Sequence, residues 1–442
     1  MLICQPKLAD ALILRMLPPV GAAYISANLK KNGFPVTVFN ACHVSQKDIA
    51  RALSRIISQN DIQVIGCGGL VTDYPQIKVI IDTARAVRPD IITFIGGALV
   101  TYSPVDAMRL IPNADIGVIG EGEITVCELA GTLENRQDLS SVNGLIIRDK
   151  NDSDRFTFTD NRVPPNVDTL PWPDYEGFGI YDLYKDSLYG AVTTSRGCPY
   201  SCTFCVPSGS GRYRQRCLDD IFSEIDFLID RYNIRNLYLS DELFAADSDR
   251  IFAFCTRAES YGIKWRVFMR ASGAYTPGLF ETMKNSGCES VYFGLESADD
   301  RILESMNKGF KRSDIEHTLK LVKNADLHTT GAFIFGDPAE TLDTMQTTID
   351  WVFENRDLLD RVSLEPITLY PGSTLYQNAV KSGIISNTAD FIQNGCPLIN
   401  VSRLTNDQYH RMVHEILPAA NKKLMDEALA YHAKTGIKNW MP

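Results

Sequence analysis

The chain has 442 residues, of which 45% are hydrophobic, and its formal net charge is -10 at pH 7. This length suits two or three domains, and the apolar content is that of a folded protein rather than a disordered one. An acidic surface repels a phosphate backbone, so the charge argues against a nucleic acid as partner.

The sequence has no apolar run long enough to span a membrane, and its first residues lack the pattern of a signal peptide. The cysteines number 11 and are scattered, which suits a reducing compartment better than a disulfide framework. We therefore expect a cytoplasmic protein.

Residues 1–135 alternate between short apolar runs and helical patterns. Continuous apolar runs closed by glycine are typical of parallel strands that are buried on both faces. The expected strands are 35–39, 62–66, 91–95 and 116–119, and the expected helices are 21–31, 46–58, 75–87 and 123–133. The pattern predicts a doubly wound, Rossmann-like α/β domain, whose ligands bind beyond the carboxyl ends of the strands.

Residues 136–186 are rich in Asp, Asn, Ser and Pro, and we interpret them as a connector with one small hairpin. Alternation resumes over residues 187–372, which predicts a partial (β/α)6 barrel. Its expected strands are 191–194, 236–239, 264–268, 290–293, 330–335 and 361–365. Residues 373–442 predict a helical C-terminal region, with the strongest pattern at 405–434.

Three cysteines stand close together as C-x3-C-x2-C: Cys198, Cys202 and Cys205. Three thiolates at this spacing can bind three irons of a cubane [4Fe-4S] cluster, and they leave the fourth iron without a protein ligand. An open metal position is where chemistry takes place. We therefore expect these three residues to be metal ligands.

Structural zinc is the alternative, with Cys217 as a fourth ligand. Cys217 follows the densest basic stretch of the chain, Arg212, Arg214 and Arg216, which fits a helix start better than a zinc site. Because this stretch adjoins the cysteines, we expect it to meet a small anionic group.

The segment 195–205 resembles the cluster loop of the radical S-adenosylmethionine (radical SAM) superfamily. The resemblance implies that SAM chelates the open iron. It also implies that an electron from the cluster cleaves a carbon–sulfur bond of SAM, which yields a 5′-deoxyadenosyl radical. Segments that end the expected barrel strands also resemble the family's SAM site. The SAM contacts that the resemblance implies are Phe204, Asp241, Arg270, Glu296, Ser297, Gly336 and Ile367.

The chemistry of these residues agrees with such roles. Glu296 can accept both ribose hydroxyls, Asp241 can stabilise an ammonium group, and Arg270 can bind a carboxylate. Glu296, Arg270 and Gly336 also have structural alternatives, and for Gly336, with Pro338, the alternative is a simple turn. Glu296 stands where Ser297 and Asp299 resemble helix caps, so it can be a helix N-terminal acid, and Arg270 can pair with a surface acid.

Three N-terminal segments, 18–25, 96–104 and 120–125, resemble the cobalamin-binding domain that precedes the barrel in a large radical SAM subgroup, the class B methyltransferases. The cobalamin contacts that the resemblance implies are Pro19, Gly21, Thr72, Gly97, Gly120, Glu121, Gly122 and Glu123. Glycine after a strand is also what any α/β turn uses. His43 lacks the Asp and Gly of the family's histidine-ligand motif, so we expect cobalamin without a histidine ligand.

The cysteines Cys4, Cys42 and Cys67 allow another interpretation, the second cluster of radical SAM methylthiotransferases. The surrounding segments fit the cobalamin pattern better. His410 and His414 lie four residues apart, and we expect a surface pair rather than a metal site.

We expect a cobalamin-dependent radical SAM enzyme that methylates an unactivated carbon. The deoxyadenosyl radical takes a hydrogen atom from the substrate, and methylcobalamin supplies the methyl group. A non-methylating radical SAM enzyme (a cyclase, a rearrangement catalyst or a methylthiotransferase) and a non-catalytic metal-binding protein stay open. The expected partners are a small metabolite, lipid or peptide substrate and an electron donor such as flavodoxin or ferredoxin. The sequence identifies no catalytic residue.

Overall fold

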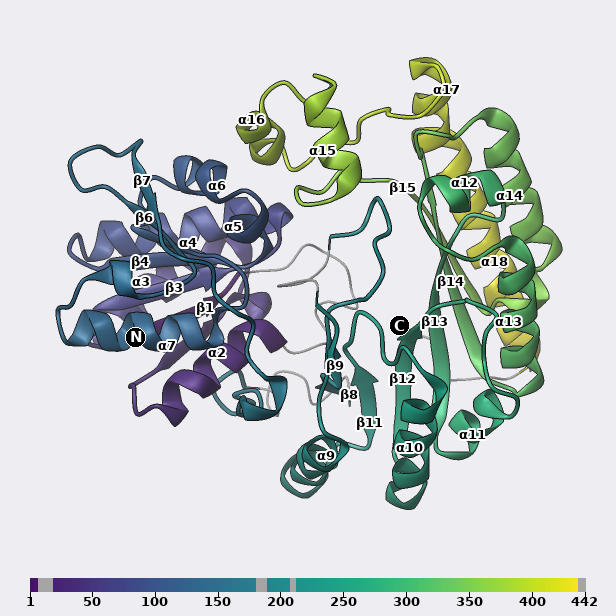
Figure 1. The fold of residues 1–442 in the computed structure, drawn as a ribbon, viewed down its shortest axis with the longest axis horizontal. Coiled ribbons are helices and arrows are strands. Elements are labelled where there is room, and N and C mark those ends of the chain that lie inside the picture. Colours follow the sequence, from purple (N-terminus) through teal and green to yellow (C-terminus); the bar gives the residue numbers. More distant parts are fainter. Residues whose placement is uncertain (7–18, 180–188, 207–211, 436–442) are drawn as a thin grey trace.

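The computed structural model describes residues 1–6, 19–179, 189–206 and 212–435, which form an N-terminal α/β domain beside a partial barrel (Figure 1). The N-terminal sheet has the strand order β2-β1-β3-β4-β5-β6-β7. Its strands are β1 (Leu2–Gln5), β2 (Thr37–Asn40), β3 (Val64–Gly68), β4 (Ile92–Gly96), β5 (Ile116–Val118), β6 (Leu145–Arg148) and β7 (Phe156–Phe158). Strands β1 to β5 are parallel, as predicted.

Two features of this sheet differ from the expectation. Strand β1 is not among the predicted strands, yet it lies between β2 and β3 and is fully buried. The hairpin in the expected connector does form, as β6 and β7, but it pairs antiparallel with β5 and extends the N-terminal sheet. A part of the segment 136–186 is therefore structurally part of the N-terminal domain.

Helices cover both faces of this sheet, as a doubly wound fold requires. Helices α3 (Ile49–Gln59) and α4 (Tyr74–Val87) contact each other and contribute to one apolar cluster. Helices α2 (Val20–Lys31) and α7 (Gly122–Glu134) contact each other and contribute to another. Two short helices, α5 (Ala98–Tyr102) and α6 (Pro104–Leu110), follow β4.

The barrel is an all-parallel sheet in the order β15-β14-β13-β12-β11-β8, which confirms the predicted six β/α units. The strands are β8 (Tyr189–Val192), β11 (Asn236–Leu239), β12 (Lys264–Met269), β13 (Cys288–Glu296), β14 (His328–Phe335) and β15 (Arg361–Pro366). The helices are α9 (Leu218–Tyr232), α10 (Ser248–Ala258), α11 (Leu279–Asn285), α12 (Asp300–Ser305), α13 (Arg312–Asn324) and α14 (Leu342–Glu354). A two-stranded ribbon, β9 (Ser195–Arg196) and β10 (Arg214–Gln215), lies between β8 and α9.

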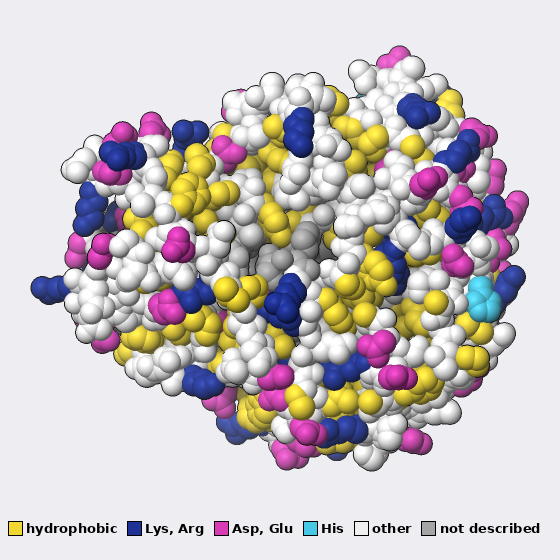
Figure 2. Space-filling model, in the orientation of Figure 1, with side chains coloured by type: hydrophobic (Ala, Val, Ile, Leu, Met, Phe, Trp, Pro, Cys, Tyr) yellow, Lys and Arg dark blue, Asp and Glu magenta, His cyan; other side chains and the backbone are white. Residues whose placement is uncertain are grey.

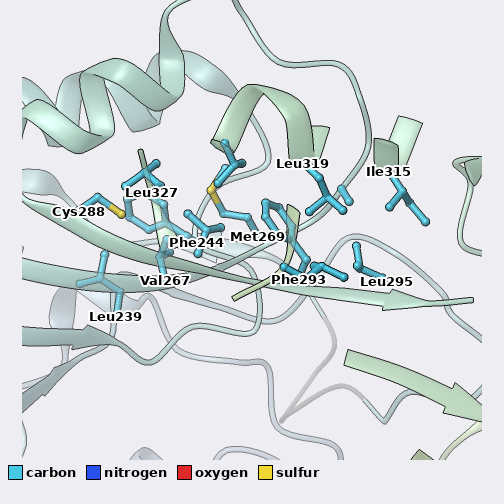
Figure 3. Packing of buried hydrophobic residues seen from close by; sticks show 14 of the residues in the cluster. Leu239, Phe244, Val267, Met269, Cys288, Phe293, Leu295, Ile315, Leu319 and Leu327 are labelled. Carbon is cyan, nitrogen blue, oxygen red and sulfur yellow. The ribbon is translucent and has the colours of Figure 1, made fainter. Parts of the chain in front are cut away.

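Alternate residues of the barrel strands are buried against the helices, because successive side chains of a strand point to opposite faces. Val267 and Phe293 belong to the same core as Leu319 of helix α13 (Figure 3). The residues that alternate with these buried ones lie on the other face of the sheet, which is the inner face of the partial barrel. They include Arg270, which follows β12, and Tyr292 in β13.

The C-terminal region is helical, as predicted. Its helices are α15 (Thr374–Lys381), α16 (Thr388–Gln393), α17 (Asn406–Arg411) and α18 (Leu417–Thr435), with a π-helical turn at Met412–Ile416. Helix α16 packs on α6 of the N-terminal domain, and α18 packs along β15. Asn421 of α18 donates to the carbonyl of Leu364 at 2.7 Å and accepts from its N–H at 3.0 Å, so α18 occupies the β15 edge of the barrel sheet.

Within the described ranges, the structure contains no helix with both the length and the apolar character that crossing a bilayer requires.

Candidate functional site

The loop that carries the three cysteines follows ribbon strand β9 and is held at its far end by two other segments. The N–H of Thr203 donates to Met306 at 3.1 Å, and the carbonyl of Thr203 accepts from Leu375 at 2.9 Å. Asn307 donates to the carbonyl of Ser201 at 3.0 Å. The loop is therefore fixed between the end of α12 and the start of α15.

The three thiols lie close enough to influence one another. Burial, together with the charges of Cys202, Glu242 and Cys198, raises the pKa of Cys205 to about 12, although the Lys308 ammonium acts to lower it. Burial also raises the pKa of Cys198. Thiolate ligation therefore requires a strong positive charge at this loop, which a metal supplies.

No three His, Cys, Asp or Glu side chains surround a single-ion position in the part of the chain that the structure describes. Three thiolates would bind three irons of a cubane and leave the fourth iron open, so the three-thiol loop offers the protein ligands that such a cluster takes. Cys217 stands at the start of α9, as expected, and its N–H donates to Asp168 at 2.6 Å. Cys217 therefore lies where a helix start is expected.

Arg270 lies against the cysteine loop. Its Nη1 is 3.8 Å from the Sγ of Cys202, and its guanidinium lies over the rings of Tyr200 at 3.7 Å and Phe310 at 4.9 Å. An arginine held between two rings beside a metal loop is placed to bind an anionic group.

Glu296 ends β13 at a bulge, where the register with β14 shifts between Gly294 and Glu296. Its φ of 64° lies in the left-handed region, which is uncommon for a non-glycine residue outside turns and helix ends. Bulges also redirect side chains beside active sites. Asp299 is the N-cap of α12, as expected, and accepts from the N–H of Arg301, whereas Glu296 lies three residues earlier, at the end of β13 and outside the helix.

Lys308 is a site residue that the sequence analysis missed. It is 5% exposed, and its Nζ lies 3.1 Å from the Oε1 of Glu296. Its ammonium also lies 5.7 Å from the ring of Phe204 and 5.2 Å from that of Phe310. Lys308 follows the short helix α12 in a polar segment, and nothing in the local sequence distinguishes it from a surface lysine.

Two expected SAM contacts have partners inside the protein. Asp241 accepts from the N–H of Thr194 at 2.7 Å and of Ser195 at 2.9 Å, and burial raises its pKa to about 7. Ser297 shares a hydrogen bond of 2.9 Å with Thr348 of α14. These two side chains hold the strand ends together, and their contacts with SAM stay predictions.

Gly336 and Ile367 shape the mouth of the barrel through their backbones. Gly336 has a φ of 105°, and a Cβ at this position would lie 3.2 Å from Tyr409. The N–H of Ile367 donates to Phe335 at 2.8 Å, and its side chain is buried. Both residues follow their strands as the resemblance implies.

The turn after β14 also contains a buried carboxyl, Glu340. Burial raises its pKa to about 7 from an ordinary value of 4.5, although Thr344 and the N–H of Gly336 donate to it. Between pH 4.5 and about 7, the folded protein keeps a proton on Glu340 that the unfolded chain has already released. The free energy of unfolding therefore decreases as the pH rises through this range.

We expect Glu340→Gln to remove that loss, because the amide is neutral at every pH. The difference in free energy of unfolding between the variant and wild type should increase by roughly 3 kcal/mol in favour of the variant between pH 4.5 and 7. Denaturant titrations at pH 5 and pH 8 measure this difference. Glu354→Gln, at an exposed position of α14, is the matched control. Equal pH dependence in all three proteins would contradict the prediction.

A cavity of about 540 Å³ lies at the carboxyl ends of β1, β3, β4 and β5. Its barrel-side wall is formed by Thr193, Ser195, Arg196, Ser240 and Glu242. The expected cobalamin contacts that line it are Pro19, Gly21, Gly97, Gly120, Glu121, Gly122 and Glu123. Thr72 is absent from the lining, although Leu70 and Asp73 of the same turn contribute to it.

The glycines give this cavity its shape. A Cβ on Gly21 or Gly120 would meet nothing within 4 Å and would project into free space. Gly97 has a φ of 78°, and a Cβ there would lie 2.5 Å from the carbonyl oxygen of Gly69. The backbone therefore forms an open cradle at a ligand-binding edge, which fits a large flat ring better than a small ligand.

The cysteines of the second-cluster alternative are buried in the N-terminal domain. Cys4 and Cys67 are register partners on β1 and β3, and burial raises the pKa of both thiols. Cys42 is also buried. The thiols of Cys4 and Cys67 line the cavity as neutral groups, and His43 is not among its described lining residues.

Glu121 and Glu123 have partners other than the expected cofactor. The Nη1 of Arg196 lies 3.0 Å from the Oε2 of Glu121 and 2.6 Å from the Oε1 of Glu123, and Arg214 also contacts Glu121. The second carboxylate oxygen of Glu123 is buried without a partner among the described residues. A donor on a bound ligand can use this oxygen.

The interpretation of the basic stretch as a site for a small anion is wrong for two of its arginines. Arg214 binds Glu121, and Arg216 is buried between Glu224 at 2.6 Å and Asp220 at 2.5 Å. These charges bind protein carboxylates, because acids from α7 and α9 converge on the ribbon. On the face shown in Figure 2, basic and acidic side chains are intermixed.

We expect Gly21→Ala to separate stability from ligand binding. Alanine in helix α2 should stabilise the ligand-free protein by up to about 1 kcal/mol, because glycine loses more backbone entropy on folding. The added methyl group should weaken corrinoid binding by about tenfold or more, as overpacking does. Thermal melts and hydroxocobalamin titrations measure the two effects.

Gly131→Ala is the control, because Gly131 lies within α7 and its Cβ would make only an ordinary contact of 3.8 Å with Phe34. It should stabilise the protein and leave corrinoid affinity unchanged. Equal corrinoid affinities in both variants and wild type would contradict the placement of Gly21 at the ligand.

Comparisons with known proteins agree with this two-domain site. The family model described as the B12 binding domain matches residues 9–130, and that of the Radical SAM superfamily matches residues 192–352. An uncharacterized methyltransferase of Pyrococcus horikoshii is 30% identical over 381 residues, which cover 83% of this chain and 80% of the relative. Cytidylyl-2-hydroxyethylphosphonate methyltransferase of Streptomyces wedmorensis is 24% identical over 424 residues, covering 83% and 78%.

Solved structures share the fold. The radical S-adenosylmethionine methyltransferase TsrM from Kitasatospora setae, solved with tryptophan and a SAM analog, aligns with a TM-score of 0.74 at 18% identity. The alignment covers 86% of this chain and 76% of TsrM. The cobalamin-dependent radical enzyme OxsB, solved with aqua-cobalamin and SAM, aligns with a TM-score of 0.68 at 21% identity, covering 93% of this chain and 60% of OxsB.

Proposed function

Because the chain belongs to the cobalamin-binding family of radical SAM enzymes, we propose that it transfers a methyl group to an unactivated carbon of its substrate. The observation that carries the proposal is the shared cavity. Its floor is the glycine cradle of the N-terminal sheet, and its opposite wall is the barrel segment that leads into the cysteine loop. A ligand on the cradle and a cofactor at the loop would face the same space.

The residues present fit three cofactors. Cys198, Cys202 and Cys205 would hold the [4Fe-4S] cluster, Arg270 and Glu296 would contact SAM, and the cradle would hold cobalamin. When bound, the cluster and SAM supply a hydrogen-abstracting radical, and cobalamin supplies the methyl group.

The side chains around these sites bind and orient rather than react. Lys308 and Arg270 place two positive charges beside the thiol loop, which favours the thiolate forms and an anionic cluster. Asp241 fixes the strand end that leads into the loop. The apolar residues of the cavity limit access of water to a reactive radical.

The anaerobic magnesium-protoporphyrin IX monomethyl ester cyclase of Synechocystis favours a second candidate, a ring-forming reaction. It is 26% identical over 347 residues, covering 75% of this chain. A cyclase and a methyltransferase can share the same cofactor sites, since fold and cofactor do not determine the product.

The test is anaerobic purification with measurement of iron, cobalt and corrinoid, followed by turnover with SAM and a low-potential reductant. The proposal expects a four-iron cluster, bound corrinoid and 5′-deoxyadenosine, and transfer of labelled methyl from SAM into an organic product. Zinc alone, or a cluster that never cleaves SAM, would overturn it. Turnover that yields deoxyadenosine and a product without label would favour the cyclase.

We also infer, from the same family, a low-potential donor such as flavodoxin or ferredoxin and a small-molecule, lipid or peptide substrate. The intermixed surface charges and the acidic net charge support a partner other than nucleic acid. The cytoplasmic location stays a prediction.

A further inference from the structure

A single arginine lies between the barrel and the cysteine loop. Asp241 accepts hydrogen bonds from the N–H groups of Thr194 and Ser195, so the chain is fixed to the barrel up to Ser195. The first expected cluster ligand is Cys198. Only Arg196 and Gly197, which has a φ of 78°, connect these two points.

The side chain of Arg196 leaves the barrel and binds the other domain. Its Nη1 lies 2.6 Å from Glu123 and 3.0 Å from Glu121, at the start of α7, and its guanidinium lies 4.6 Å from the ring centre of Tyr24 in α2. The side chains of Arg196, Glu121 and Glu123 are 16%, 8% and 6% exposed, so these charges are largely removed from water. Hydrogen-bonded charge pairs that are shielded from water keep a defined geometry, so this contact fixes the direction of the Arg196 side chain.

A second arginine reinforces this contact. Arg214 is the ribbon partner of Arg196, since β10 pairs with β9 at these two residues. Arg214 binds the other oxygen of Glu121 and donates to the carbonyl of Pro165 at 2.8 Å. Both guanidiniums of the ribbon therefore bind one carboxylate of the N-terminal domain.

The same groups form part of the cavity wall. Arg196, Glu121, Glu123 and Tyr24 all line the cavity. The Oε2 of Glu123 is buried at this wall, and none of the residues that the structure describes bonds to it. A ligand that fills the cavity therefore contacts the carboxylates that hold Arg196, and Arg196 is two residues from the first cysteine.

We propose that Arg196 is a positioning residue that fixes the cluster loop relative to the cavity, so that filling the cavity with a corrinoid orders the cluster. The inference rests on the proposed function. Arg196 itself touches no reacting atom. It acts through Gly197 on the position of Cys198, and its geometry depends on Glu121 and Glu123.

The experiment compares wild type with Arg196→Gln, Arg196→Lys and Glu121→Gln, all anaerobically reconstituted with iron, sulfide and hydroxocobalamin. The matched control is Arg162→Gln, because Arg162 binds Glu128 of the same helix α7 with both of its Nη atoms. The first readout is the affinity for hydroxocobalamin. The second is the distance distribution between the reduced cluster and cob(II)alamin, measured by pulsed electron paramagnetic resonance.

Arg196→Gln should lower corrinoid affinity by about tenfold or more, because Glu121 and Glu123 lose the charge that holds them at the cavity wall, and it should broaden the distance distribution. Arg196→Lys should restore part of the affinity, but not the narrow distribution, because lysine lacks the planar fork. The control should match wild type in both. If Arg196→Gln does not fold, Glu121→Gln tests the same contact from the other domain.

A narrow distribution and unchanged affinity in the folded Arg196 or Glu121 variants would overturn the inference. That result is distinct from failure of the proposed function, in which wild type itself would bind no corrinoid or form no cluster.

Discussion

Cys202→Ala should abolish SAM cleavage while leaving the protein folded. Cys202 is half-buried and lies beside Arg270, and its thiol would be one of only three protein ligands of the cluster. Loss of one ligand from a three-ligand cubane should remove the cluster. We expect 5′-deoxyadenosine formation to fall by more than about 100-fold, the loss that even supporting residues of a metal site can cause.

Iron and sulfide content, together with deoxyadenosine formation, measure this effect. Cys217→Ala is the matched control, since Cys217 is exposed at the start of α9 and has a role only in the zinc alternative. It should retain full iron content. Loss of bound metal in Cys217→Ala, with zinc in the wild-type protein, would instead support a four-cysteine zinc site.

Substitutions of Glu296 and Lys308 should have the second large effect. A double-mutant cycle separates their effect on stability from their effect on SAM binding. Removing one partner of a buried ion pair costs about 3–5 kcal/mol, because the other charge stays buried. Glu296→Gln and Lys308→Met should each lower stability on this scale. The double variant should be close to wild type in stability, because no unpaired charge is left.

SAM binding should not recover in the double variant. A hydrogen bond to a charged group contributes about 1.5–3 kcal/mol, so loss of the Glu296 carboxylate should raise the KM for SAM by roughly 10- to 100-fold. Deoxyadenosine formation over a range of SAM concentrations measures it. Recovery of the wild-type KM in the double variant would mean that Glu296 is only the structural partner of Lys308.

Features that depend on short sequence patterns were predictable. The cysteine spacing identifies the loop because its ligands are neighbours in the chain. The alternation of apolar runs and helical patterns identifies both sheets, since buried parallel strands are apolar throughout. Strand β1 escaped prediction, because it is only four residues long and ends beside a proline.

Features that depend on tertiary proximity were not predictable. Lys308 reaches Glu296 only because the chain returns to the end of β13 after α12. Arg196 and Glu121 are 75 residues apart and meet where the two domains join. The hydrogen bonds that Asp241 accepts from Thr194 and Ser195 could not be predicted either, because these residues follow a different strand. Sequence position gives the edge of the sheet, but not the direction of a side chain there.

The contact between Asn421 and Leu364 affects how the molecule behaves in a crowded solution. An unprotected outer strand offers N–H and C=O groups to any other extended chain, and self-association follows. Because α18 occupies this position on β15 and the Asn421 amide fills both hydrogen-bonding sites of Leu364, the half-open barrel can leave its mouth accessible to substrate without offering its β15 edge as a template for aggregation.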